Sequence, residues 1–395
     1  MELYYPIVGG AETHAKLLNH ELKQKGMKTM VITRRRTTEL PAHEKIDEVP
    51  VYRVRPTGHA RIGKYLMMMP AFSELIRRRK DYDVIYVCGL RVLGVVGVAA
   101  AKMLGKRCIV RSESCGEVSG GFMFGKGSIE GNSLKEAVGK LLICARNAIL
   151  KQADGYVAIS NVIQDEYIAA GLDKKKIAFI PNGIDTDKYS PATDGEKNRL
   201  RKALGLPADK TLFLYTGKLN KGKGLEMLLR AWKRAAQSDS NLHLLLVGGG
   251  GLQVLSCEDE LRTFVQQNLM ENNVTFTGYV NNVIEYLKAA DVFVFASESE
   301  AQGLSLVEAL SCGLPAIATS AGGISDFLED GVNGRLIPID DEDSLVNVIA
   351  EFVDDVGRAG KLGVQGRKTA VDSFDTKKDV ERHISLFNED YLSFE

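Results

Sequence analysis

The chain has 395 residues, which is too long for one ordinary hydrophobic core and suits two α/β domains of roughly 150 to 200 residues each. Apolar residues make up 45% and charged residues 26%, a globular composition that argues against a disordered chain. The formal net charge is zero, yet residues 1–180 hold 29 Lys and Arg against 18 Asp and Glu, a net +11, and the remainder carries −11. The basic first half favours an anionic partner, either a phosphate group or an acidic membrane surface.

Six cysteines are scattered without a C-x-x-C pair, which argues against a zinc site and against a disulfide framework. The sequence contains no apolar run of the ~18 to 20 residues that would span a bilayer, and its N-terminus lacks a signal-peptide layout. We therefore expect a soluble protein of the reducing cytoplasm.

In the first half, short apolar runs rich in β-branched residues alternate with amphipathic stretches. The predicted strands are 29–33, 51–54, 84–87, 108–111, 156–159 and 177–180. The predicted helices are 11–25, 65–79, 92–104, 134–152 and 161–170.

The same alternation starts again after residue 207. Strands are predicted at 212–215, 242–247, 274–277, 292–296 and 316–319, and helices at 225–236, 258–268, 283–289, 304–311 and 344–352. Strands of this composition, joined by helices, indicate parallel sheets with right-handed crossovers, so we predict two doubly wound α/β domains in tandem. The proline- and glycine-containing stretch 185–207 is predicted to be a hinge.

Ligands of open parallel sheets bind beyond the carboxyl ends of the strands, so the candidate residues directly follow predicted strands. The segment 297–310 is the richest. Gly303 lets the backbone approach a ligand, and the helix that starts beside it offers N–H groups to a phosphate. Glu308 falls among apolar residues one turn into that helix, where an ionised carboxylate needs donors such as sugar hydroxyls. For Glu308 and for Glu300 in the loop, an ordinary exposed glutamate is an equally good interpretation.

Three further glycine-rich segments follow predicted strands or open helices. Residues 217–224 place two lysines five positions apart at a helix N-terminus, which suits a diphosphate, although a solvated basic loop explains them as well. The glycines at 248–251 allow close approach by a base or phosphate and fit a flexible turn equally. Residues 9–12 open the first helix, where a tight turn is the alternative.

Five motifs occur in order along nearly the whole chain: G-G-A-E at 9–12, I-P-N-G-I-D at 180–185, G-K-L leading to K-G at 217–224, glutamates at 300 and 308, and A-L-S-C-G-L-P at 309–315. This ordered set resembles the retaining glycosyltransferases of family 4, which have the GT-B fold. The resemblance implies two tandem Rossmann-like doubly wound parallel-sheet domains facing a central cleft.

The resemblance assigns residues 1–187 to an acceptor-binding domain, 188–372 to a nucleotide-sugar-binding domain, and 373–395 to a C-terminal helix that packs back towards the first domain. The family usually begins with a full apolar strand, for which only residues 1–8 are present. We therefore expect a truncated first strand, so that either the start is misplaced or the domain tolerates a missing strand.

The resemblance also implies residue roles. Lys218 and Lys223 hold the donor diphosphate, Glu308 binds the donor ribose, and Glu300 positions the transferred sugar without a covalent step. The lysines and helix N-termini replace a divalent cation, so no metal and no other cofactor is expected. The implied catalytic residues are Glu300, Lys218 and Lys223; the donor-binding residues are Gly9, Gly10, Gly217, Lys218, Lys223, Gly248, Gly249, Glu300, Gly303, Leu304, Ser305 and Glu308; and Arg111, Glu113 and Asn182 are assigned to the acceptor side.

Some positions depart from the family pattern. Family members often carry a histidine after the strand that matches 108–111, whereas Arg111 is followed here by serine and Glu113, so that sugar contact is unassigned. Lys218 replaces the usual arginine and gives up bidentate phosphate contact. Ala301 and Gln302 replace the usual Gly-Phe, a change that bears on the choice of sugar.

The implied reaction transfers a hexose or N-acetylhexosamine from a nucleotide diphosphate sugar to an acceptor hydroxyl of a glycan or a lipid-linked or phosphate-bearing glycan, in cell-envelope polysaccharide or glycolipid synthesis. The basic, apolar stretch 61–80 suits an anionic membrane surface, at the inner face of the cytoplasmic membrane, and suits packing on the first sheet equally. No nucleic-acid partner is expected. The rival readings are a nucleotide-sugar epimerase of the same fold and an inactive glycosyltransferase-like partner subunit.

Overall fold

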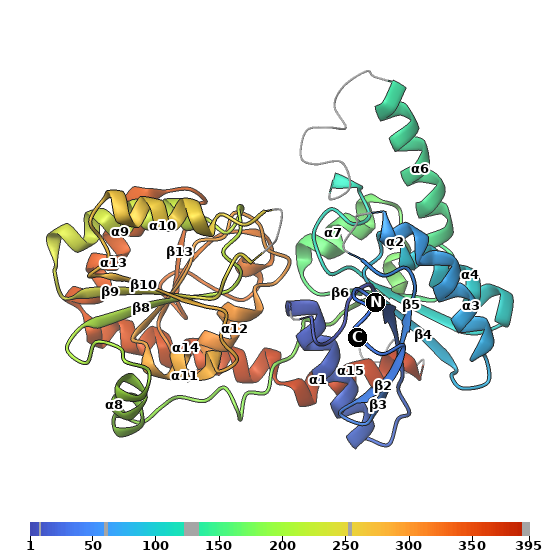
Figure 1. The fold of residues 1–395 in the computed structure, drawn as a ribbon, viewed down its shortest axis with the longest axis horizontal. Helices are drawn as coiled ribbons and strands as arrows, with labels where there is room; N and C mark the ends of the chain where they lie inside the picture. Colours follow the sequence, from blue (N-terminus) through green and yellow to red (C-terminus); the bar gives the residue numbers. More distant parts are fainter. Residues whose placement is uncertain (8, 59–61, 122–133, 252–254, 389–395) are drawn as a thin grey trace. The chain divides into compact units, whose positions relative to one another are not determined.

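The computed structural model describes residues 1–7, 9–58, 62–121, 134–251 and 255–388. They divide into two compact units, one formed by Met1–Gly183 with Thr376–Glu395 and the other by Ile184–Asp375. In Figure 1 the first unit runs from blue to green and includes the red end of the chain, and the second runs from green to orange-red.

The second unit is built on one six-stranded sheet in the order β10-β9-β8-β11-β12-β13, with parallel neighbours throughout. Its strands are β8 (Thr211–Thr216), β9 (Leu242–Val247), β10 (Val274–Gly278), β11 (Val292–Phe295), β12 (Ala316–Thr319) and β13 (Arg335–Ile337). Its helices are α8 (Asp194–Ala203), α9 (Leu225–Ser238), α10 (Glu258–Gln267), α11 (Val283–Ala289), α12 (Leu304–Ser311), α13 (Glu342–Asp354) and α14 (Val356–Phe374), with the 3₁₀ turn η2 (Gly322–Asp326).

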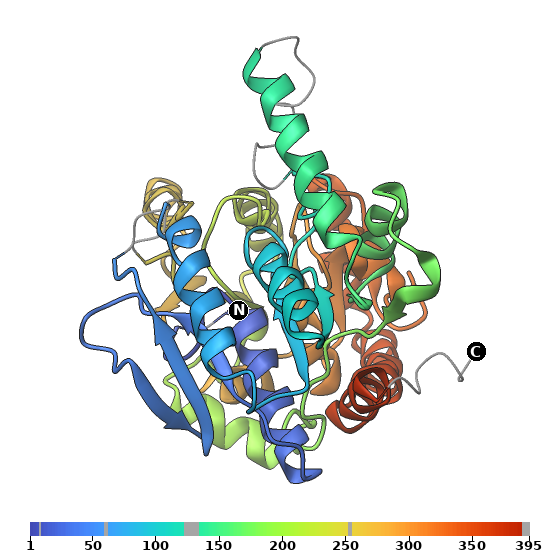
Figure 2. The same cartoon turned by 90° about the vertical axis from the view of Figure 1, so that its right-hand side faces the viewer.

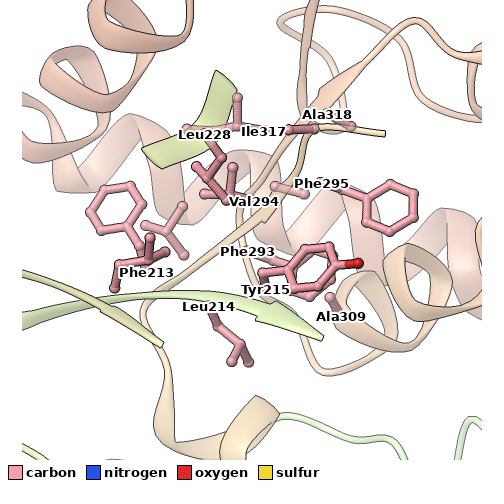
Figure 3. Close-up of a cluster of buried hydrophobic side chains, with 14 of the residues drawn as sticks. Phe213, Leu214, Tyr215, Leu228, Phe293, Val294, Phe295, Ala309, Ile317 and Ala318 are labelled. Carbon is pink, nitrogen blue, oxygen red and sulfur yellow. The ribbon is translucent and has the colours of Figure 1, made fainter. Parts of the chain in front are cut away.

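The core of the second unit lies on both faces of this sheet. Every residue of β9, β11 and β12 is buried, as expected for central strands covered by helices on each side. Figure 3 shows the centre of the cluster, where the rings of Tyr215 and Phe295 stack at a centroid distance of 6.4 Å. This packing holds the carboxyl ends of β8 and β11 in fixed positions.

The first unit contains two sheets. Parallel strands make up the order β4-β5-β6-β7, and a second sheet has the order β1-β3-β2, in which only β2 is antiparallel. The strands are β1 (Val31–Arg34), β2 (His43–Ile46), β3 (Val49–Val54), β4 (Val84–Cys88), β5 (Arg107–Arg111), β6 (Gly155–Ala158) and β7 (Ile177–Phe179). The helices are α1 (Gly10–Gln24), α2 (Gly63–Leu66), α3 (Met68–Arg77), α4 (Leu93–Leu104), α6 (Leu134–Leu150), α7 (Asn161–Ala169) and α15 (Thr376–Phe387), with the 3₁₀ turn η1 (Lys174–Lys176).

Helices α3, α4 and α6 lie side by side in the first unit, since α4 packs against both of the others. In both views α6 projects beyond the sheets of its own unit (Figures 1 and 2). The predicted architecture of two Rossmann-like α/β domains is confirmed, because each unit joins parallel strands through helices.

The predicted hinge at 185–207 was wrong over part of its length, because α8 occupies Asp194–Ala203. The side chain of Thr193 caps this helix by accepting the Glu196 backbone N–H at 3.2 Å, and acidic residues in the first turn and basic residues in the last suit the helix dipole. The prolines and glycines thus flank a short helix. The sequence analysis also missed β2 and β13, which are short strands.

Candidate active site

The strand order of the second unit reverses between β8 and β11. The chain moves outward from β8 through β9 to β10 and then continues on the other side of β8 with β11, β12 and β13. In open parallel sheets such a switch point opens a crevice beyond the carboxyl ends of the strands, where ligands bind. The loop after β8 carries Lys218 and Lys223, and the loop after β11 carries Glu300.

An ion pair joins these two loops. The Nζ atom of Lys223 contacts Oε1 of Glu300, to which the Ser297 hydroxyl also donates a hydrogen bond at 2.8 Å. The Lys223 side chain is 30% exposed and that of Glu300 is 13% exposed, so the ammonium can meet a ligand while the carboxylate is largely withdrawn from water. Two residues that the sequence assigned separately are therefore in direct contact.

The two helices that open at this edge both begin with a left-handed glycine. Gly224 precedes α9 with φ +63° and Gly303 precedes α12 with φ +89°. Glycine has no side chain to cap the first-turn N–H groups, which leaves helix N-termini that suit an anion. Leu304 and Ser305 form the first turn of α12.

Glycines of the β8 and β9 loops allow backbone to pack on backbone. A Cβ atom on Gly248 would lie 1.9 Å from the Gly217 carbonyl oxygen, and both residues have φ values that other residues rarely adopt. The Leu219 backbone N–H donates to the Gly249 carbonyl at 3.3 Å. These contacts give Gly217, Gly248 and Gly249 a clear structural role, and their contact with a donor stays a prediction.

Glu308 lies one turn into α12, between apolar neighbours. Burial raises the pKa of its carboxyl group to about 7, and a hydrogen bond with the Tyr189 side chain works in the opposite direction. A carboxylate of this kind is expensive to ionise without added hydrogen-bond donors. The structure shows that Glu308 is partly buried, so it is not an ordinary exposed glutamate, and its contact with a donor ribose stays a prediction.

The predicted acceptor-side residues meet in the first unit. Arg111 lies at the end of β5 and is fully buried. Its Nη2 group donates hydrogen bonds to Oδ1 of Asn182 and, at 3.1 Å, to Oε2 of Glu113. Its Nη1 donates to Nδ1 of His14 at 2.8 Å. The structure thus brings all three predicted residues together around one guanidinium. Gly9 and Gly10 open α1 on the same unit, and Glu12 lies in its first turn.

Sequence reasoning missed two members of this network. His14 accepts from Arg111 at Nδ1, so its Nε2 carries the proton and donates to Asp379 of α15 at 2.7 Å. Burial and the neighbouring guanidinium lower the pKa of His14, while Asp379 acts in the opposite direction. Asp379 also accepts the Gly183 backbone N–H at 3.3 Å. No sequence signal connects His14 with a residue 365 positions away.

A third missed residue is Glu166 of α7, which fixes the loop after β5. Its carboxylate accepts three backbone N–H groups, from Gly116, Val118 and Ser119, each at 2.7 Å. These three charge-assisted hydrogen bonds hold the loop after β5 in one conformation.

Across the described ranges, no group of three or more His, Cys, Asp or Glu side chains is arranged to hold a metal ion. None of the described helices is both long and apolar enough to cross a membrane.

Comparison with known proteins agrees with this geometry. The family model "Glycosyltransferase Family 4" matches residues 8–188, and "Glycosyl transferases group 1" matches residues 196–369. The chain belongs to the family 4 glycosyltransferases with the GT-B fold.

Relatives of this family 4 glycosyltransferase include proteins of bacteria and archaea. It is 27% identical to an uncharacterized glycosyltransferase of Methanocaldococcus jannaschii, over 89% of this chain and 88% of that protein. It is 25% identical to the D-inositol 3-phosphate glycosyltransferase 1 of Catenulispora acidiphila (96% and 90%) and 28% identical to the UDP-Gal:alpha-D-GlcNAc-diphosphoundecaprenol alpha-1,3-galactosyltransferase of Escherichia coli (82% and 79%).

Solved structures share the fold of this glycosyltransferase. Sucrose-phosphate synthase from Thermosynechococcus elongatus superimposes with a TM-score of 0.80 at 24% identity, over 98% of this chain and 94% of that one. Anabaena HepE in complex with UDP and glucose gives a TM-score of 0.77 at 21% identity, over 96% of each chain.

Proposed function

We propose that this glycosyltransferase moves a hexose or N-acetylhexosamine from a nucleotide diphosphate sugar to an acceptor hydroxyl, with retention of configuration and without a metal ion. The observation that carries the proposal is the Lys223–Glu300 pair at the switch point of the second sheet, beside two glycine-led helix N-termini. The fold neighbour HepE, which is in complex with UDP-glucose in one structure, is consistent with a donor of this class.

In this proposal, different residues of the second unit bind the diphosphate, the ribose and the transferred sugar of the donor. Lys218 and Lys223 neutralise the diphosphate that leaves with the nucleotide, and the N-termini of α9 and α12 add their dipoles. Glu308 accepts hydrogen bonds from ribose hydroxyls, which supply the donors that its buried carboxylate needs. Glu300 contacts the transferred sugar and stabilises the positive charge that develops on its ring; it forms no covalent bond.

Retention follows if the acceptor attacks the face from which the diphosphate leaves, within a short-lived ion pair. The acceptor oxygen bonds to the anomeric carbon as the bond to the diphosphate breaks, and the acceptor proton passes to a leaving phosphate oxygen. Basic groups at the phosphate are therefore the main protein contribution to the rate. No divalent cation is needed in this scheme.

For the acceptor we propose a glycan that is lipid-linked or bears a phosphate, met at an anionic membrane surface. Helix α6 carries the exposed apolar side chains of Leu141 and Leu142, with Lys140 directly before them. Met69 of α3 is a further large exposed apolar side chain, and Lys64 lies on the neighbouring helix α2. The name of the Escherichia coli relative specifies a lipid-linked acceptor. Met67 and Ala71 of the stretch 61–80 are buried, so that stretch also packs into its own unit.

Thermal-shift screening against UDP-, GDP- and ADP-sugars tests the proposal first, since a ligand that binds only the folded state raises the midpoint. The active donor should then glycosylate a panel of acceptors, including undecaprenyl diphosphate glycans, and proton NMR of the product should show the donor's anomeric configuration. Release of free nucleotide from donor alone, with an altered sugar and no acceptor, would favour an epimerase. Donor binding without turnover on any acceptor would favour an inactive partner subunit.

A further inference from the structure

The loop after β11 carries Glu300 and lies between two other loops, because β11 pairs with β8 on one side and with β12 on the other. On the β8 side, a Cβ atom on Gly224 would lie 1.8 Å from the Ala296 carbonyl oxygen, closer than real Cβ atoms come to such an atom. The Glu298 backbone N–H donates to the Gly222 carbonyl at 3.0 Å. The first half of the loop is therefore fixed against the β8 loop by its backbone.

The loop after β12 fixes the second half. Gly322 has a φ of +56°, and a Cβ atom there would lie 1.9 Å from the Glu300 carbonyl oxygen. The same carbonyl accepts the Gly323 backbone N–H at 3.2 Å. The Thr319 hydroxyl, at the end of β12, donates to the Ser297 carbonyl. Since only glycine allows so close an approach, the β12 loop sets where the backbone of Glu300 lies.

Two side chains share one carboxylate oxygen of Glu300. Its Oε1 atom accepts the Ser297 hydroxyl at 2.8 Å and also contacts Nζ of Lys223. Ser297 is fully buried, whereas the Lys223 side chain is 30% exposed. A ligand can therefore reach the ammonium and not the hydroxyl, so a diphosphate that takes Lys223 leaves the Ser297 contact in place.

The Ser297 contact matters most when Lys223 is engaged by a ligand. The Glu300 side chain is only 13% exposed, so water supplies few hydrogen bonds to its carboxylate. A charged carboxylate in such surroundings is costly unless other groups donate to it. A hydrogen bond to an ionised acceptor is roughly twice as strong as one between neutral groups. Ser297 is placed to supply that donor.

We propose that Ser297, Gly322 and Gly323 are positioning residues of the donor site, which hold Glu300 in place while a diphosphate occupies Lys223. Ser297 fixes the carboxylate, and the two glycines fix the backbone that carries it. All three act through Glu300 and not by contact with the donor. This inference rests on the proposed function, in which Lys223 binds the diphosphate and Glu300 contacts the transferred sugar.

Ser297→Ala tests the role of the hydroxyl. It should weaken the binding of UDP roughly three- to tenfold by calorimetry, because Glu300 loses a donor that it needs once the diphosphate has taken Lys223. Ser299→Ala, at an exposed position in the same loop, is the matched control and should change the affinity by less than about twofold. In a Glu300→Gln background, Ser297→Ala should also change the affinity by less than about twofold, because no carboxylate remains to be held. An unchanged affinity in the parent background, or an equal loss in both backgrounds, would overturn the proposal.

Gly322→Ala tests the role of the backbone through turnover, measured as nucleotide release from UDP-glucose, GDP-mannose and ADP-glucose with water or the acceptor panel. The added methyl group displaces the Glu300 carbonyl and should lower kcat roughly tenfold or more. Gly331→Ala is the control, because Gly331 has a φ of +72° with no atom within 4 Å of its Cβ position, and it should change kcat by less than about twofold. Equal losses for the two variants would overturn the proposal, since strain at a left-handed residue would then explain both. A parent chain that binds none of UDP, GDP and ADP, or turns over none of these donors, would instead count against the proposed function.

Discussion

Lys223 and Glu300 lie 77 positions apart in the sequence and form an ion pair at the switch point of the second sheet. The ammonium that we propose as a diphosphate ligand is therefore engaged by a carboxylate of the same site. In the proposed mechanism a diphosphate competes with Glu300 for this cation, and the exchange releases Glu300 towards the sugar. The proposed roles of Lys223 at the diphosphate and of Glu300 at the sugar then both depend on the ion pair between them.

Glu300→Gln should therefore tighten the binding of UDP roughly three- to thirtyfold by calorimetry, because Lys223 no longer has an ionic partner. Glu298→Gln removes an equal charge from an exposed position in the same loop and should change the affinity by less than about twofold.

The same substitution in a Lys223→Ala background separates two causes of that gain. If Glu300 acts by engaging Lys223, Glu300→Gln adds nothing once the lysine is gone. A gain that persists in the double variant would mean that Glu300 simply repels the diphosphate.

Lys223→Ala should lower turnover roughly a hundredfold or more, because the leaving diphosphate loses a preorganised positive charge. Adding magnesium should not restore the rate, since the described residues of the site hold no metal-binding cluster. Lys221→Ala is the matched control: this lysine is exposed in the same loop and pairs with Glu260 at 3.1 Å. Magnesium rescue of the Lys223 variant would refute the charge-neutralising role.

Glu308 should make folding stability fall as the pH rises. Its folded-state pKa is about 7 against an ordinary 4.5, so the folded chain holds more protons between these values and loses stability as pH increases through them. Glu308→Gln should match the parent at pH 5 and exceed its free energy of unfolding by about 3 kcal/mol at pH 8, by urea denaturation.

The control for this measurement is Glu226→Gln on the exposed face of α9, which should change the free energy of unfolding by less than about 0.5 kcal/mol at either pH. If Glu308→Gln kept the parent's loss of stability between pH 5 and 8, another group would be responsible.

Glu308→Gln should also bind UDP-sugars at least roughly tenfold more weakly, because a neutral amide accepts ribose hydroxyls less strongly than a carboxylate.

Leu141→Asp combined with Leu142→Asp should reduce co-sedimentation with phosphatidylglycerol vesicles at least about tenfold, since the two leucines are 69% and 63% exposed on α6 and would enter the interface. Met103→Asp is the control, because Met103 is 59% exposed at the C-terminal end of α4. Unchanged sedimentation of the double variant, or an equal loss with Met103→Asp, would argue against α6 as the membrane contact.

Asp379→Asn should destabilise the chain by about 2 to 4 kcal/mol in urea denaturation at neutral pH, because it weakens a buried carboxylate that accepts from His14 and Gly183. Burial raises the pKa of Asp379, but the neighbouring His14 and His383 and their hydrogen bonds to the carboxylate outweigh it and hold the pKa well below its ordinary value; Nδ1 of His383 lies 2.9 Å from Oδ1 of Asp379. Its contribution is therefore present above the unfolded-state pKa near 3.9 and is lost as the pH falls.

Glu381→Gln is the control for that variant. Glu381 lies on the same helix, is mostly exposed and pairs with Lys25 at 3.7 Å, so the change should cost less than about 1 kcal/mol. If the two variants lost the same free energy of unfolding, the buried hydrogen bonds of Asp379 would contribute no more to stability than the exposed ion pair of Glu381.

Local sequence patterns were sufficient to predict the architecture and the candidate positions. Apolar β-branched runs such as 242–247 and 292–296 identify buried parallel strands, because strands covered on both faces tolerate few polar residues. Glycines and charged residues directly after those runs identify the ligand edge. Short strands with mixed composition, such as β2, and the capped helix α8 in a proline-rich stretch were missed, because weak local preferences there are decided by their neighbours.

Contacts between distant segments were decided by the tertiary structure alone. Sequence spacing places Lys223 and Glu300 in two loops, and only the order of β8 and β11 in the sheet brings them into contact. The network of His14, Arg111 and Asp379 likewise requires α1, β5 and α15 to meet at one point. A local pattern shows which residues lie on one helix or strand. Hydrogen bonds and ion pairs act over only a few ångströms, so those between distant segments depend on how the tertiary structure brings these segments together.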